Sequence, residues 1–136
     1  MAIFVASAEL SDEEFLAAFG SCELPLSSFR HGDHLRLAWI QLHHGKTLEE
    51  ALSAVREGIQ KYAAHHGQSR LYHETITAAW VKLLATHHEA TFEEFIASNV
   101  HRLNPGLLHR FWSPEVLQSE AARLTWVAPD RKALPN

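Results

Sequence analysis

The sequence predicts an all-α protein, built as a single-domain helical bundle over residues 1–136. Three capping boxes each introduce a segment whose apolar residues recur at three- and four-residue spacing, the period of an amphipathic helix. No alternating apolar and polar run is bounded by hairpin dipeptides, so strand signals are weak. With 136 residues and 46% hydrophobic content, the chain is long enough to bury one core.

Most of the predicted helices have a recognisable start. Serine or threonine followed three residues later by glutamate forms a capping box, in which both side chains satisfy backbone N–H groups of the first turn. Such boxes occur as SDEE, TLEE and TFEE, and SPEV adds an N-cap serine followed by proline, which suits the first helical position. The connector NPGLLHRFW is expected to hold one more turn. Helices are therefore predicted over residues 12–19, 29–44, 48–65, 70–87, 92–99 and 114–124.

The three long helices, 29–44, 48–65 and 70–87, are joined by short polar links, which is typical of an up-and-down bundle. In that arrangement the first and third of them run parallel, so their N-terminal ends lie at the same level. The shorter helices are expected to pack across this bundle. The C-terminal segment WVAPDRKALPN has two prolines and no helical period, which predicts either a strap over the bundle or a mobile tail. Its Trp126 and Val127 favour the strap.

Composition excludes several classes of partner and site. Twelve basic and sixteen acidic side chains give a formal charge of −4, so neither nucleic acid nor an anionic membrane surface is expected as a partner. A single cysteine, Cys22, rules out an intramolecular disulfide and a cysteine-rich zinc site. No segment approaches the roughly 18 uninterrupted apolar residues of a membrane span, and the N-terminus lacks the basic region of a signal peptide. A cytoplasmic protein is therefore expected, and its oligomeric state stays open.

Histidine is the unusual component, with eleven residues against one methionine and two tyrosines. His31 and His34, in the stretch HGDHLRLAW, stand three apart and therefore share one helical face. They continue the apolar stripe of their predicted helix by one turn toward its N-terminus. His73 lies three residues before Ile76 and seven before Trp80, so it is also predicted to face the core. Because these helices begin at the same level, the three imidazoles are expected to converge at one end of the bundle.

Neutral imidazoles are good ligands for zinc, copper and iron, and three protein ligands leave a position open for water or substrate. The sequence therefore predicts a mononuclear site in which His31, His34 and His73 hold one divalent transition metal. Glu74 is expected to act as a base or as an additional ligand, and Asp33 is the alternative carboxylate for that ligand position.

Four other side chains complete the predicted site. Tyr72 is expected to donate a hydrogen bond to a bound ligand and is grouped with Glu74 as catalytic. Arg36, Trp39 and Trp80 are expected to bind the substrate. The two indoles would form an apolar floor, and Arg36 would pair with Glu74 across the helices.

These residues favour a metal-dependent enzyme that acts on a small molecule. With copper or iron the centre suits an oxidoreductase that uses oxygen, and with zinc it suits hydrolysis or group transfer. Two alternatives stay open. One is a non-catalytic protein that binds metal or is stabilised by it. The other is a metal-free adaptor, in which His31 and His34 cap a helix and His73 is a core histidine hydrogen-bonded to Glu74 or to a carbonyl.

The segments HGDHLRLAW, YHETIT, FWSPEVLQSEAAR and APD…LP resemble a group of small, largely uncharacterised bacterial all-helical proteins over most of the chain. This resemblance implies an all-helical single domain with His31, His34, His73 and Glu74 as its functional cluster. A weaker similarity, of architecture alone, is to the DinB-like metal-binding four-helix bundles, which gather three histidines at one bundle end. In those proteins the second and third histidines share a helix, whereas here the pair lies on the earlier helix.

Overall fold

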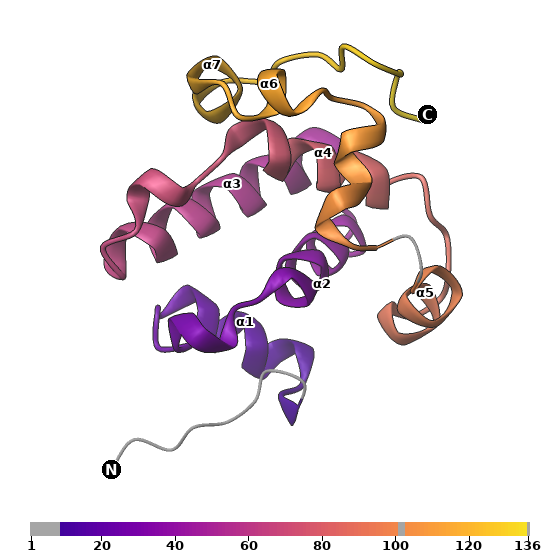
Figure 1. The fold of residues 1–136 in the computed structure, drawn as a ribbon. Helices are drawn as coiled ribbons and strands as arrows, with labels where there is room; N and C mark the ends of the chain where they lie inside the picture. Colours follow the sequence, from indigo (N-terminus) through magenta and orange to yellow (C-terminus); the bar gives the residue numbers. More distant parts are fainter. Residues whose placement is uncertain (1–8, 101–102, 136) are drawn as a thin grey trace.

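The computed structural model describes residues 9–100 and 103–135, and all regular structure within these ranges is helical (Figure 1). The predicted all-α class is therefore confirmed. None of the helices in these ranges is long and apolar enough to cross a membrane. Residues 1–8, on which the expected lack of a signal peptide rests, lie outside the described residues.

Three helices form the centre of the fold: α2 (His31–Leu42), α3 (Leu48–His65) and α4 (Glu74–Leu84). Each packs against the other two, and their buried apolar side chains contribute to one continuous core. The chain runs along α2, returns along α3 and runs forward again along α4 (Figure 1). The N-terminal ends of α2 and α4 therefore lie on the same side of the molecule, as the up-and-down order predicts.

The three predicted capping boxes mark real helix starts. Ser11, Thr47 and Thr91 precede α1 (Asp12–Gly20), α3 and α5 (Phe92–Asn99), and each side chain accepts a hydrogen bond from the backbone N–H of the glutamate three residues on. The bounds of α3 and α5 are those predicted, and α1 is longer by one residue. Each N-cap stabilises its helix by roughly 1 kcal/mol, so these short local motifs are strong start signals.

Two of the long helices are shorter than predicted. α2 begins two residues late, because Phe29 ends the preceding 3-10 turn η2 (Leu26–Ser28). α4 begins four residues late and ends three residues early. A separate 3-10 turn, η3 (Ser69–Leu71), occupies the stretch before it. The backbone of His73 is extended, so the helix cannot continue backward through this residue.

The last predicted helix is wrong as a single element, because it is divided into α6 (Pro114–Leu117) and α7 (Glu120–Leu124). Ser119 lies between them with an extended backbone, and its side chain accepts a hydrogen bond from the N–H three residues on. It therefore caps a new helix instead of continuing the old one. The turn expected in NPGLLHRFW is the 3-10 helix η4 (Pro105–Arg110).

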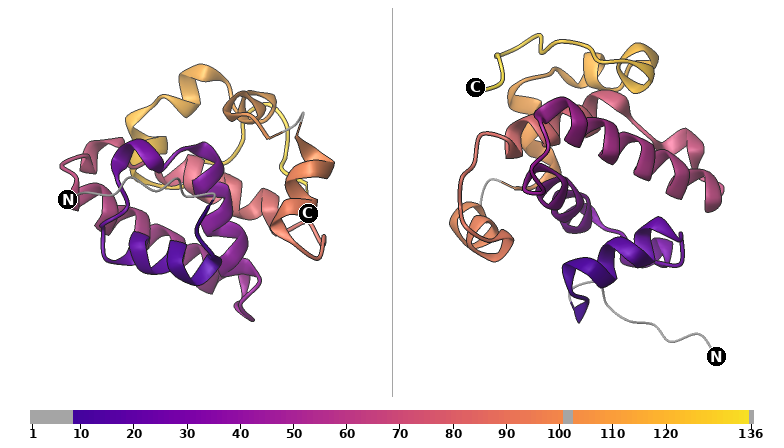
Figure 2. Two further views of the ribbon diagram at one scale, coloured as in Figure 1. Left: turned by 90° about the horizontal axis from the view of Figure 1, so that it is seen from below. Right: turned by 180° about the vertical axis from the view of Figure 1, so that it is seen from behind.

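The C-terminal segment lies as a strap along the outer side of α4, beyond α6 and α7 (Figure 2). Thr75 on α4 is fully buried; its hydroxyl donates a hydrogen bond to the carbonyl of Thr125 and accepts one from the N–H of Val127. Trp112, also fully buried, donates from its indole N–H to the carbonyl of Val127. Side chains of the folded core thus satisfy main-chain groups of the strap, which fixes its position.

Candidate functional site

A cavity of about 580 Å³ lies between α2, α3, α4 and η4, near the N-terminal ends of α2 and α4. Its volume is within the range of pockets that bind small molecules, roughly 300–1,000 Å³. Most of its wall is apolar and comes from the three central helices. The apolar lining includes Ala38, Val55, Ile59, Ile76, Trp80 and Leu108, and the polar lining is His31, His34, Tyr72, His73, Thr77, His109 and Gln118.

Some of the predicted site residues line this cavity and others do not. On α2 the cavity faces positions 31, 34 and 38, which follow one another at the three- and four-residue spacing of one helical face. Positions 36 and 39 lie on other faces of the same helix. His31, His34, Tyr72, His73 and Trp80 line the cavity, whereas Arg36, Trp39 and Glu74 do not.

His31 is anchored at the cavity by the main chain. Its Nε2 lies 2.9 Å from the carbonyl oxygen of Leu103, and the edge of its ring contacts Trp80 at 4.9 Å between ring centroids. Burial lowers the pKa of His31 below its ordinary value, although the bond to Leu103 opposes this change. His31 thus bonds through one ring nitrogen and leaves Nδ1 without a hydrogen bond to any other described residue.

His34 lies one turn further along α2, with its ring 4.2 Å from that of Phe29. Neither of its ring nitrogens makes a hydrogen bond to another residue in the described ranges. Burial lowers the pKa of His34 to about 4; the neighbouring His31 acts in the same direction, and Asp33 opposes it. The imidazole of His34 is therefore neutral at pH 7 and can both donate and accept one hydrogen bond.

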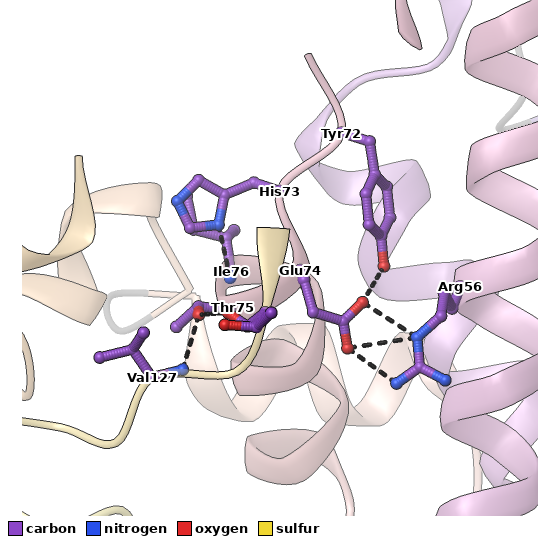
Figure 3. Close-up of polar contacts among 8 residues, drawn as sticks. Arg56, Tyr72, His73, Glu74, Thr75, Ile76 and Val127 are labelled. Atoms are coloured by element: carbon purple, nitrogen blue, oxygen red, sulfur yellow. Dashed lines mark hydrogen bonds and ion pairs between the residues drawn. The ribbon is translucent and has the colours of Figure 1, made fainter. Parts of the chain in front are cut away.

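His73 has no free ring nitrogen in this structure. Its Nδ1 accepts a hydrogen bond from the N–H of Ile76 at 3.1 Å, and its Nε2 donates to the carbonyl of Leu117 at 2.7 Å. Figure 3 shows the first of these bonds at the start of α4. His73 therefore has the structure expected of a core histidine that bonds to a carbonyl, which is one of the alternatives that the sequence left open.

In the part of the chain that the structure describes, the predicted ligands His31, His34 and His73 do not stand in a ready-made arrangement around one metal ion. Among the residues that the structure describes, no group of three or more histidine, cysteine, aspartate or glutamate side chains is arranged to hold a metal ion. The metal centre stays a prediction, and the hydrogen bonds of His73 fit it poorly because a ligating nitrogen needs an unshared lone pair.

Glu74 turns away from the cavity toward α3 (Figure 3). Its carboxylate accepts hydrogen bonds from Arg56 at 2.7 and 2.9 Å and from the Tyr72 hydroxyl at 2.6 Å. Burial alone would raise the pKa of Glu74, but these donors outweigh burial and hold that pKa below its usual range. A charged carboxylate in a two-point ion pair links α3 to the start of α4 and positions Tyr72 against the cavity wall.

The predicted pair of Arg36 with Glu74 is wrong. Arg36 lies on the opposite flank of α2, where its guanidinium bonds to Asp12 at 2.9 Å and to the carbonyl of Leu10 at 2.7 Å. Trp39 likewise belongs to the core on the far side of the helix and stacks on Phe95 at 4.8 Å. Arg36 and Trp39 therefore support the packing of α2 and lie away from the cavity.

Three lining residues, Thr77, His109 and Gln118, were not predicted as site residues. Thr77 follows His73 by four residues, so helical spacing alone would have placed it on the same face. His109 and Gln118 come from η4 and the end of α6, whose positions depend on the path of the chain after α5. No periodic signal in the sequence indicates where those turns lie.

Comparison of the chain with protein-family models, with curated proteins and with solved structures found no match. The resemblance to small bacterial helical proteins and to DinB-like bundles therefore stays a prediction.

Proposed function

We propose that the protein binds a small, largely apolar molecule in this cavity. The observation that carries the proposal is the imidazole of His34, which lines a mainly apolar cavity without a hydrogen bond to another described residue. His34 is partly buried, and a ligand that bonds to its imidazole would gain the free energy of one net hydrogen bond. Trp80 and the aliphatic wall would at the same time remove apolar ligand surface from water.

The same geometry supports binding better than proton-transfer catalysis. A general base works best when its pKa lies near the working pH, and burial lowers the pKa of His34 to about 4. At pH 7 this imidazole accepts hydrogen bonds but is a weak base. Glu74, the other predicted base, is held in an ion pair outside the cavity. Both observations favour a binding role for the cavity.

The binding proposal can be tested with N-phenyl-1-naphthylamine, an uncharged probe that fluoresces in apolar surroundings. We expect one probe molecule to bind per chain. Ala38→Leu adds side-chain volume at the cavity wall and should weaken binding by about 10-fold or more. Ala64→Leu makes the same change at an exposed position of α3 and is the matched control. Equal binding by the two variants, or no binding by the wild type, would contradict the proposal.

The predicted copper, iron or zinc centre and its oxygen-dependent chemistry make a competing function. The three predicted ligands, His31, His34 and His73, all line one cavity, which supports it, but a metal ion would have to displace the main-chain hydrogen bonds of His73. Titration of tag-free protein with Zn²⁺ and Cu²⁺ separates the two functions. A site lost in both His31→Ala and His73→Ala would support the metal centre. Metal binding that these substitutions leave unchanged would contradict it.

A further inference from the structure

Three of the polar side chains that line the cavity, those of His31, Tyr72 and His73, already make hydrogen bonds within the protein, and these bonds fix what each can offer a ligand. The carbonyl oxygen of Leu103 can only accept, so Nε2 of His31 carries the proton of their 2.9 Å bond. In the neutral ring the other nitrogen, Nδ1, then has a lone pair. This nitrogen makes no hydrogen bond to another described residue. His31 can therefore offer a ligand an acceptor.

Tyr72 has no proton to offer. Its hydroxyl donates to the carboxylate of Glu74 at 2.6 Å, and Arg56 holds that carboxylate in the charged form, which accepts only (Figure 3). The lone pairs of the Tyr72 oxygen can accept a further hydrogen bond. His73 contributes nothing to a ligand, because both of its ring nitrogens bond to the main chain. These two side chains therefore add no donor to the wall.

The lining also lacks formal charge. No lysine, arginine, aspartate or glutamate is among the described residues that line the cavity. Placing a charged group in an apolar site without a partner is strongly unfavourable. An anion would need a protonated histidine beside it, and burial opposes that by lowering the pKa values of His31 and His34. The cavity thus favours uncharged ligands.

The size of the cavity indicates the size of the ligand. A protein cavity of about 150 Å³ can hold benzene, and this cavity measures about 580 Å³. It has room for two fused rings with a polar substituent. The indole of Trp80 and the side chains of Ile59 and Leu108 provide apolar surface for such a ring system.

We infer that the ligand is an uncharged phenol or alcohol with a fused-ring body, whose hydroxyl donates a hydrogen bond to His31 or His34. This inference rests on the proposed function, because it names the chemical class that the proposed binding site would select.

Three probes with the same ring system test this inference: 2-naphthol, naphthalene and 2-naphthoate, each titrated calorimetrically into the full chain at neutral pH. We expect 2-naphthol to bind about 10-fold more tightly than naphthalene, the effect of one net hydrogen bond. We also expect 2-naphthol to bind at least about 10-fold more tightly than 2-naphthoate, because the carboxylate would be buried without a cation.

Two variants locate the acceptor. His31→Phe and His34→Phe keep a flat ring of similar size but remove the ring nitrogens. In at least one of them the preference for 2-naphthol over naphthalene should disappear, and the retained affinity for naphthalene shows that the cavity is intact.

The possible outcomes separate the two ideas. If none of the three probes binds the wild type, the proposed function fails, and this inference fails with it. If the probes bind but 2-naphthoate equals or exceeds 2-naphthol, the cavity binds ligands and the inferred ligand class is wrong. The inference is equally overturned if naphthalene matches 2-naphthol, or if both phenylalanine variants keep the preference.

Discussion

The partly buried imidazole of His34 should make the free energy of unfolding depend on pH in a way that one substitution can isolate. Burial lowers its pKa to about 4 in the folded chain, against 6.5 for an ordinary histidine. Between these values the unfolded state binds more protons than the folded state, so the free energy of unfolding falls as the pH is lowered. The stabilisation from neutral His34 is complete above pH 6.5 and is lost as the pH falls to about 4.

The size of this effect follows from the two pKa values. Their difference corresponds to a ceiling of about 3 kcal/mol, because one pKa unit equals about 1.4 kcal/mol. Water that enters the cavity would screen the ring, so we expect a loss of about 2 kcal/mol between pH values of about 7.5 and about 4.5. The nearest titratable neighbours, His31 and Asp33, are present both in the wild type and in a His34→Gln variant, so the difference between the two proteins isolates His34.

Urea unfolding at several pH values measures this difference. Wild-type stability should fall by about 2 kcal/mol more than that of His34→Gln over this range. His44→Gln changes an exposed histidine and is the matched control, which should follow the wild type. If the profiles of wild type and His34→Gln were parallel, the imidazole of His34 would not be buried in its neutral form, and the reasoning about the cavity would fail with it.

Five further substitutions, at four positions, test the contacts that support the fold around the site. Thr75→Ala should lower the free energy of unfolding in urea by about 2–3 kcal/mol, because two main-chain groups of the strap lose a buried partner. Thr75→Ser keeps the hydroxyl and loses one methyl group, so it should lower the free energy of unfolding by about 1 kcal/mol. Gly58→Ala places a Cβ 2.8 Å from the ring of Phe19 on α1 and should lower the free energy of unfolding by about 1–3 kcal/mol. Gly32→Ala meets nothing within 4 Å and should raise the free energy of unfolding by up to about 1 kcal/mol. Glu74→Gln should lower the free energy of unfolding in urea by about 2 kcal/mol, because it leaves Arg56 without its carboxylate. A loss below about 0.5 kcal/mol would contradict a stabilising role for this ion pair.

The helix starts that could be predicted are those whose signal is local. Thr47 and Thr91 each bond to a backbone N–H three residues away, so four consecutive letters contain the whole interaction. The start of α4 could not be found in this way. The apolar period runs through His73 without a break, and what holds this residue in an extended conformation includes a bond to Leu117, 44 residues further along the chain.

The same distinction between local and distant contacts applies to the candidate site. Helical spacing correctly placed His31 and His34 on one face of α2 and Trp80 of α4 beside the same cavity, but it wrongly added Trp39 and left out Thr77. It could not indicate that Glu74 turns to Arg56, because that contact depends on how α3 is rotated about its own axis. The contribution of His109 was equally hidden, since the position of η4 is determined by packing over the bundle end and not by any period in the sequence.

The ring nitrogens that two of the cavity's histidines can offer are therefore set by the part of the chain that follows the three long helices. An imidazole on a helix face can be a metal ligand, a donor or an acceptor, and its spacing is the same in each case. The carbonyl of Leu103 selects one tautomer of His31, and the carbonyl of Leu117 removes the remaining nitrogen of His73 from use. Moving either carbonyl by the width of one hydrogen bond would expose a different ring nitrogen to the cavity without changing any residue of α2 or α4. The ligand class should consequently respond to substitutions in the C-terminal third of the chain as strongly as to substitutions of the histidines themselves.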